Sequence, residues 1–242
     1  MEIINAILVL FMGASIGSFF NVVVMRRDSE VKFYQGRSRC GSCGKELGIL
    51  DLIPIFSYIG LKGKCRYCGN SLTIKYVIGE LIGALSFMAT YLLYEIGVGG
   101  INEYILTVSF LLLAISDLHT QEIRYKYILI PFLTLVGLNI FSSGKDIYYI
   151  QLLAMFIIMY VIFIFSKNKM GGADVLMLTY IAGFYGIEWT GYIIIVACTV
   201  SILEIGIVCL KQGKEIALKT PIPFITSLVI AKVIIDWILI IK

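Results

Sequence analysis

The chain has 242 residues, of which 59% are hydrophobic and 15% are charged, and its mean hydropathy is +0.93. A soluble domain is nearer half apolar and a quarter charged, so the composition excludes an ordinary soluble protein and predicts a polytopic membrane protein. The formal net charge is only +4, so the placement of the basic residues is more informative than their number. We expect no nucleic-acid partner.

Long apolar runs recur along the chain. The first, from Ile3 to Met25, is longer than the apolar core of a signal peptide and lacks a small-residue cleavage site, so we interpret it as a retained membrane helix. Several runs are shorter than the roughly 20 residues that a perpendicular helix needs. An all-α fold of about eight transmembrane helices is predicted, with ends uncertain by about 2–4 residues, at Ile3–Met25, Ile74–Ile96, Tyr104–Leu118, Tyr127–Phe141, Ile147–Phe165, Asp174–Ile187, Tyr192–Leu210 and Phe224–Ile241.

The basic residues are distributed unevenly between the connecting segments. The connections after spans two, four and six contain only Lys145, whereas those after spans one, three, five and seven contain sixteen Lys or Arg residues. Because cytoplasmic loops of membrane proteins are enriched in Lys and Arg, this pattern predicts an outside N-terminus and places the basic loops in the cytoplasm.

One connection, residues 26–73, is long enough to fold by itself. It contains Cys40-Gly-Ser-Cys43 and Cys65-Arg-Tyr-Cys68, two C-x-x-C pairs separated by 21 residues. This spacing is typical of a zinc ribbon, in which four thiolates complete a closed structural site. The alternative is a redox pair or unligated thiols, but a cytoplasmic loop keeps its thiols reduced and disfavours two disulfides. The other cysteines, Cys198 and Cys209, are expected to pack in the core.

Two acidic residues border apolar spans. Asp117 ends the third span, and Asp174 begins the sixth directly after Gly171, Gly172 and Ala173. An ionisable residue at the edge of a membrane helix is costly and therefore a candidate functional residue. The alternative for Asp174 is an N-cap of its helix. The predicted topology places both acids at the cytoplasmic edge, where they can face each other.

Other polar residues invite weaker hypotheses. Glu80 lies within the second span and needs a partner there, whereas Lys232 and Asp236 are four residues apart and can neutralise each other. His119 is the sole histidine, so it cannot build a zinc-protease site, and Ser-His-Asp chemistry has no G-x-S-x-G elbow here. We expect His119 to lie in a loop or at most to support a neighbouring group.

The sequence resembles the type IV prepilin peptidases over nearly its whole length. The resemblance begins with Gly17-Ser-Phe-Phe-Asn-Val-Val23 and Arg26, and continues through the two cysteine pairs. Asp117 with Ile123 looks like the first aspartate motif of the family, and Gly171-Gly-Ala-Asp174 looks like its G-x-G-D element. Further matching positions are Ile53–Tyr58, Gly63–Gly69, Tyr76, Glu80, Gly83 and Pro223-Phe224.

The resemblance implies an integral-membrane aspartic endopeptidase of the bacterial inner membrane. Such enzymes remove the short basic leader of prepilins or pseudopilins at the cytoplasmic face, and many also methylate the new N-terminal amine with S-adenosylmethionine. Asp117 and Asp174 would be the catalytic pair, and Cys40, Cys43, Cys65 and Cys68 the zinc ligands. Weaker assignments to substrate or cofactor binding fall on Asn21, Arg26, Glu80, Gly171 and Gly172.

The match implies three parts, namely a first helix at 1–25, a zinc-binding loop at 26–73 and a peptidase core at 74–242. The chain departs from the family pattern at Asp28, Arg124, Ala173 and Leu176, and no glycine-rich fingerprint for S-adenosylmethionine is visible. Two other classes remain open: an ion- or proton-coupled transporter that uses the buried acids, and a non-catalytic scaffold whose zinc knuckle binds a partner. The oligomeric state cannot be predicted.

Overall fold

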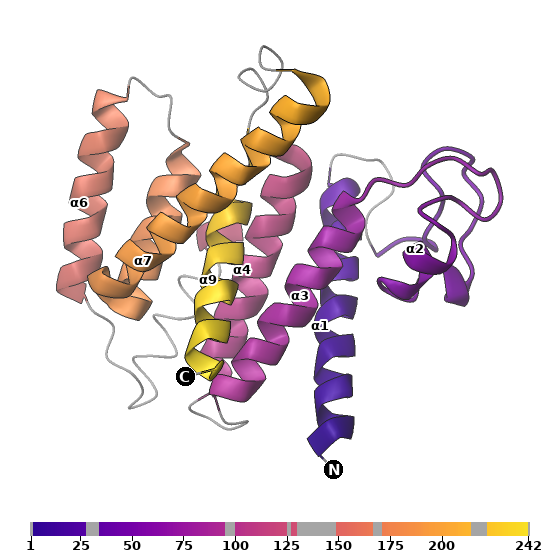
Figure 1. Ribbon diagram of the computed structural model, residues 1–242, viewed down its shortest axis with the longest axis horizontal. Coiled ribbons are helices and arrows are strands. Elements are labelled where there is room, and N and C mark those ends of the chain that lie inside the picture. Colours follow the sequence, from indigo (N-terminus) through magenta and orange to yellow (C-terminus); the bar gives the residue numbers. More distant parts are fainter. Residues whose placement is uncertain are drawn as a thin grey trace.

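A computed structural model describes residues 2–27, 34–94, 100–124, 127–129, 149–166, 171–213 and 222–241. These residues form helices and loops without a β-sheet, which confirms the predicted all-α fold (Figure 1). Five of the described helices are long and apolar enough to cross a membrane, and α6 (Tyr149–Phe165) is shorter. The five are α1 (Glu2–Met25), α3 (Lys75–Leu93), α4 (Ile101–Thr120), α7 (Gly172–Gln212) and α9 (Phe224–Ile241).

Seven of the eight predicted spans fall on these helices, and most of the Tyr127–Phe141 span lies outside the described residues. The sixth and seventh spans are the two halves of α7, which bends at Gly186. Gly186 has φ 83° and ψ 165°, a conformation that glycine adopts readily because it lacks a Cβ. Figure 1 shows the two halves of α7 diverging from this bend as a V. The chain therefore does break between two helices, as predicted, but the break lies at Gly186 and not at residues 188–191.

Helices α1 and α3 pack with their backbones almost in contact. Gly13 and Gly17 on α1 face Gly83 and Gly79 on α3, and each glycine is four residues from its partner on the same helix. A Cβ added to Gly13 would lie 2.4 Å from the Gly83 carbonyl oxygen, and one added to Gly17 would lie 2.5 Å from that of Gly79. Glycine pairs at this spacing permit close helix association in a bilayer, where packing replaces the hydrophobic effect.

A buried polar cluster joins α4, α7 and α9 near the bend of α7. The Lys232 ammonium donates to Asp236 Oδ2 at 2.6 Å, with both side chains almost fully buried, which confirms the predicted pair. The Tyr185 hydroxyl donates to Glu103 Oε2 at 3.3 Å, and the Lys232 ammonium lies 5.7 Å from the centre of the Tyr185 ring. These contacts satisfy charges that apolar surroundings would otherwise make costly.

The Lys232→Met substitution is expected to destabilise the protein by about 3–5 kcal/mol, because it leaves Asp236 buried without its cation. Thermal unfolding in detergent would measure the change. The double substitution Lys232→Met with Asp236→Leu is the control, since it removes both charges and should recover much of the loss. Equal destabilisation in the single and double variants would contradict the role assigned to the pair.

Candidate active site and metal site

Asp117 is buried near the end of α4 and receives hydrogen bonds from the start of α9. The Thr226 backbone N–H donates to Asp117 Oδ2 at 3.0 Å. Thr226 lies in the first turn of α9, where backbone N–H groups have no partner within the helix. The positive end of a helix dipole therefore points toward this carboxylate and favours negative charge on it.

The Thr226 hydroxyl also contacts the end of α4. It lies 2.9 Å from the Ala114 carbonyl oxygen and 3.3 Å from Asp117 Oδ2, and its single proton can serve only one of these acceptors at a time. Through its backbone and its hydroxyl, Thr226 thus fixes both the position of the carboxylate and the packing of α9 against α4.

Asp174 lies in the first turn of α7 and is partly buried. The N-cap of α7 is Gly171, which has extended backbone angles and makes no side-chain cap, so Asp174 does not fill the N-cap position. A Cβ added to Gly171 would lie 2.9 Å from Asp174 Oδ2. Gly171 therefore provides the space in which the Asp174 carboxylate sits, and Gly172 begins the helix.

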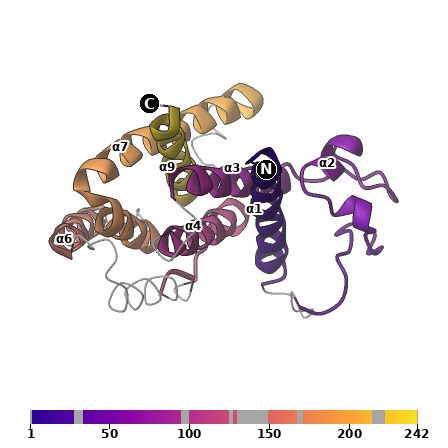
Figure 2. The same ribbon diagram turned by 90° about the horizontal axis from the view of Figure 1, so that it is seen from below.

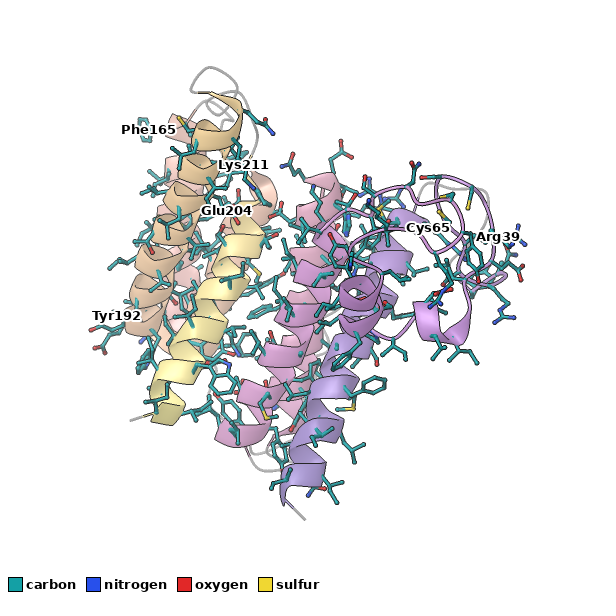
Figure 3. The ribbon with its side chains drawn as sticks, turned by 45° about the vertical axis from the view of Figure 1, so that its right-hand side comes forward. Arg39, Cys65, Phe165, Tyr192, Glu204 and Lys211 are labelled. Carbon is teal, nitrogen blue, oxygen red and sulfur yellow. The ribbon has the colours of Figure 1, made fainter. Side chains whose placement is uncertain are left out.

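The two acids belong to the same end of the bundle. Asp174 is close enough to Asp117 for the two charges to repel each other. Glu204, on the second half of α7 and labelled in Figure 3, also interacts electrostatically with Asp117, as does the cationic Lys75 at the start of α3. The Lys75 ammonium donates to the Leu118 carbonyl oxygen at 2.6 Å, at the C-terminal end of α4 where helix carbonyls lack partners.

Asn21 joins three helices near the end of α4. Its Nδ2 donates to the Tyr76 carbonyl oxygen at 3.0 Å, so its Oδ1 accepts a hydrogen bond from His119 Nε2 at 2.8 Å. His119 lies in the last turn of α4, and the expectation that it is a loop residue was wrong. It supports a neighbouring group, because its bond to Asn21 ties α1 and α3 to the helical turn that carries Asp117.

Glu80 and Arg26 hold the loop that follows α1. Glu80 is buried in α3, and its Oε2 accepts the Ile55 backbone N–H at 2.7 Å, which supplies the partner that an acid in an apolar helix needs. Arg26 donates to the carbonyl oxygens of Gln35 and Arg37 at 3.0 and 2.9 Å. In the structure both residues anchor the loop, and their assignment to substrate or cofactor binding stays a prediction.

The four cysteines of the two C-x-x-C pairs converge within this loop. Their sulfur atoms lie within 4.8 Å of one another, an arrangement that can hold a metal ion. Each pair folds into a tight turn whose next residue, Gly44 or Gly69, has a φ near +70° and donates its N–H back to the carbonyl of the first cysteine. The backbone N–H groups of Cys43 and Ser42 lower the pKa of the Cys40 thiol to about 6, which favours the thiolate.

Two family models match the chain. Residues 11–94 match the Bacterial Peptidase A24 N-terminal domain, and residues 104–207 match the Type IV leader peptidase family. The chain belongs to the type IV leader peptidase family. Together with the long apolar helices, this membership makes the chain a multi-pass membrane protein.

Several curated relatives of this chain carry the name prepilin leader peptidase/N-methyltransferase. The Bacillus subtilis protein is 28% identical, over 90% of this chain and 88% of its own length. The Vibrio cholerae protein is 27% identical, over 84% of this chain and 87% of its own length. The Stutzerimonas stutzeri protein is 26% identical, over 92% of this chain and 86% of its own length. No solved structure matches the chain.

Thr226 was not predicted from the sequence to belong to the site. Its signal was available, because Pro223 precedes an apolar run and thereby marks a helix start whose free N–H groups need an acceptor. Lys75 was also missed, although a basic residue at the head of one helix is well placed to meet the carbonyl end of its antiparallel neighbour.

The Cys40→Ser substitution is expected to release the metal ion from the purified leader peptidase, because it removes one of four sulfur ligands. Metal analysis of the purified protein measures the loss. Cys198→Ser is the matched control, since Cys198 is exposed on α7, outside the group of four cysteines, and its replacement should leave the metal content unchanged. A wild-type protein that carries no metal would contradict the assignment of these four cysteines.

Proposed function

We propose that this chain is a membrane-embedded aspartic endopeptidase that removes the basic leader from type IV prepilins or pseudopilins. Asp117 and Asp174 are the proposed catalytic pair. The observation that carries the proposal is that two acids far apart in the sequence lie at one end of the bundle, with their charges interacting, in a chain of the leader peptidase family. The comparisons give no support to a transporter.

The chemistry follows from two carboxylates that share one proton. Thr226 and the N-terminus of α9 favour the negative charge on Asp117, so Asp117 takes a proton from water. The water oxygen then attacks the scissile carbonyl carbon while Asp174 donates its proton to the carbonyl oxygen. When the tetrahedral intermediate collapses, the proton held by Asp117 passes to the leaving amine, the C–N bond breaks, and one hydroxyl of the intermediate returns its proton to Asp174.

The proposed metal is zinc, held by Cys40, Cys43, Cys65 and Cys68. Four sulfur ligands suit zinc and leave no open position for water, so the ion would stabilise the loop rather than hydrolyse a peptide. When bound, it would cross-link the two C-x-x-C turns. The catalytic acids lie on other elements, in α4 and α7.

The proposed location is the bacterial inner membrane, with the loop and both acids on the cytoplasmic side. The excess of Lys and Arg in the connections on this side supports that orientation. A prepilin with a basic leader and a hydrophobic helix could then enter from the bilayer, with its cleavage site at the inner surface.

Methylation of the new N-terminus is the second proposed activity, by analogy with the names of the relatives. S-adenosylmethionine would supply the methyl group. No residue in the described part of the chain is assigned to hold it, so the cleavage proposal does not depend on it.

The test is to co-express the protein with a prepilin from the same genome and to determine the mass of the prepilin N-terminus. Loss of the leader is expected, and one additional methyl group would identify the second activity. A prepilin that keeps its leader in the presence of folded, membrane-inserted protein would contradict the peptidase. It would then favour a scaffold whose metal-binding loop recruits a partner.

A further inference from the structure

The metal-binding loop exposes an unusual number of large apolar side chains. They are borne by a single 3₁₀ turn, η1 (Ile49–Asp51), by the short helix α2 (Phe56–Gly60) and by the segment between them, and the two helical elements contact each other. We call these five side chains the apolar surface of the loop. Their exposed fractions are 79% for Ile49, 67% for Leu50, 42% for Leu52, 70% for Phe56 and 65% for Ile59. A concentration of this kind marks an interaction surface.

A partly buried hydrogen bond fixes the height of this surface relative to the membrane helices. The N–H of Ile55, the residue before α2, donates to Glu80 at 2.7 Å. Glu80 is five residues beyond Lys75, the first residue of α3. Since a helix rises 1.5 Å per residue, the bond lies about 7.5 Å inward from that end of α3.

The views of the molecule agree with this placement. Figure 1 shows α2 beside the bodies of α1 and α3, below the level at which α1 ends. Figure 3, turned about the vertical axis, keeps the same heights and shows Cys65 above the helical turns of the loop. Figure 2 shows the loop at the edge of the bundle next to α1, on the side away from α6. The helical side of the loop therefore lies alongside the bundle.

We propose that the apolar surface of the loop inserts into the lipid bilayer at its interface, so that the loop is anchored to the membrane in which its own chain is embedded. An interfacial amphipathic element is buried roughly 5–10 Å at the boundary between headgroups and acyl chains, which matches the depth set by Glu80. Exposed apolar side chains of the membrane helices, Phe19 on α1 and Leu81 on α3, make a lipid-facing surface at this depth.

The charge of the loop favours a lipid partner. Its described residues include six exposed basic side chains and only two acidic ones, Glu46 and Asp51. Four thiolates with a divalent ion would reduce the positive net charge of these residues but would not reverse its sign. Basic residues around an inserted apolar surface attract anionic headgroups. The six are Arg37, Arg39, Lys45, Lys62, Lys64 and Arg66.

The proposal does not depend on peptidase activity, and fluorescence of single-tryptophan proteins tests it. The chain has two tryptophans, Trp189 and Trp237, which are both replaced with phenylalanine before Phe56→Trp is introduced. The full chain is reconstituted in vesicles of phosphatidylcholine and phosphatidylglycerol, with or without bromine near the top of the acyl chains. The reference is a protein that retains only Trp237, which lines a groove of apolar residues on α9 and α3. The tryptophan at position 56 is expected to lose as much fluorescence in brominated vesicles as Trp237 does in the reference protein.

Tyr34→Trp in the same background is the matched control. Tyr34 is 69% exposed, almost the same as Phe56, but its neighbour Gln35 is held by Arg26 beyond the end of α1. This protein should be quenched by iodide in the water and less by brominated lipid. Ile49→Trp provides a second position on the apolar surface should Phe56→Trp fail to fold.

Two outcomes would overturn the proposal. One is that tryptophan at positions 56 and 49 is quenched by iodide as strongly as tryptophan at position 34, which would leave the surface in water. The other is that both are shielded from iodide and from brominated lipid alike, which would mean that protein covers the surface, most simply a second copy of the chain.

Discussion

Asp117→Asn and Asp174→Asn are each expected to lower the rate of prepilin cleavage by about 10⁴-fold or more. An amide can neither accept a proton from water nor donate the shared proton to the carbonyl oxygen, so each substitution removes one half of the proposed chemistry. The two losses should not add in the double variant, because the pair acts as a unit. Cleavage of a purified prepilin in single-turnover reactions measures all three rates.

The matched control is Glu188→Gln, which makes the same acid-to-amide change at an exposed position near the bend of α7. It should cleave at the wild-type rate. All variants should retain their thermal stability and their metal content. Wild-type cleavage by either aspartate variant would remove that residue from the catalytic pair.

Gly171→Ala is expected to lower the rate of prepilin cleavage by about 10²-fold. A loss of this size follows when a catalytic group is displaced by roughly 1 Å. The added Cβ would lie 2.9 Å from Asp174 Oδ2, so the carboxylate must move. The backbone angles of Gly171, φ −69° and ψ 136°, suit alanine, and the clash is with the end of a flexible side chain. The substitution should therefore impair cleavage without destabilising the protein.

Gly191→Ala makes the identical change elsewhere on α7, where an added Cβ has no atom within 4 Å. It should leave cleavage unchanged and slightly stabilise the helix, because alanine favours the helical state over glycine. If both alanine variants cleave equally well, Gly171 does not set the position of Asp174. If Gly171→Ala instead unfolds the protein, its role is structural.

The sequence predicted those features that local patterns encode. Uninterrupted apolar runs located the helices, and the spacing of Cys40, Cys43, Cys65 and Cys68 predicted that their sulfur atoms would converge. The position of the bend in α7 was not predicted, because Gly186 lies inside the predicted sixth span and only its backbone angles show that the helix is interrupted there.

Long-range contacts account for what the sequence could not predict. The partner of Glu80 is a backbone N–H, at Ile55, and any residue type can supply one. His119 was expected to lie in a loop or at most to support a neighbouring group, and the predicted third span ended before it, at Leu118. Its bond to Asn21 compensates for its burial, and α4 continues to Thr120.

The most direct test of the central claim is a structure of the Asp174→Asn protein in a membrane environment with an uncleaved prepilin bound. The account predicts that the scissile carbonyl lies between the side chains at positions 117 and 174, within hydrogen-bond reach of both. A prepilin whose scissile bond contacts only one of these side chains, or lies on another face of the bundle, would contradict it.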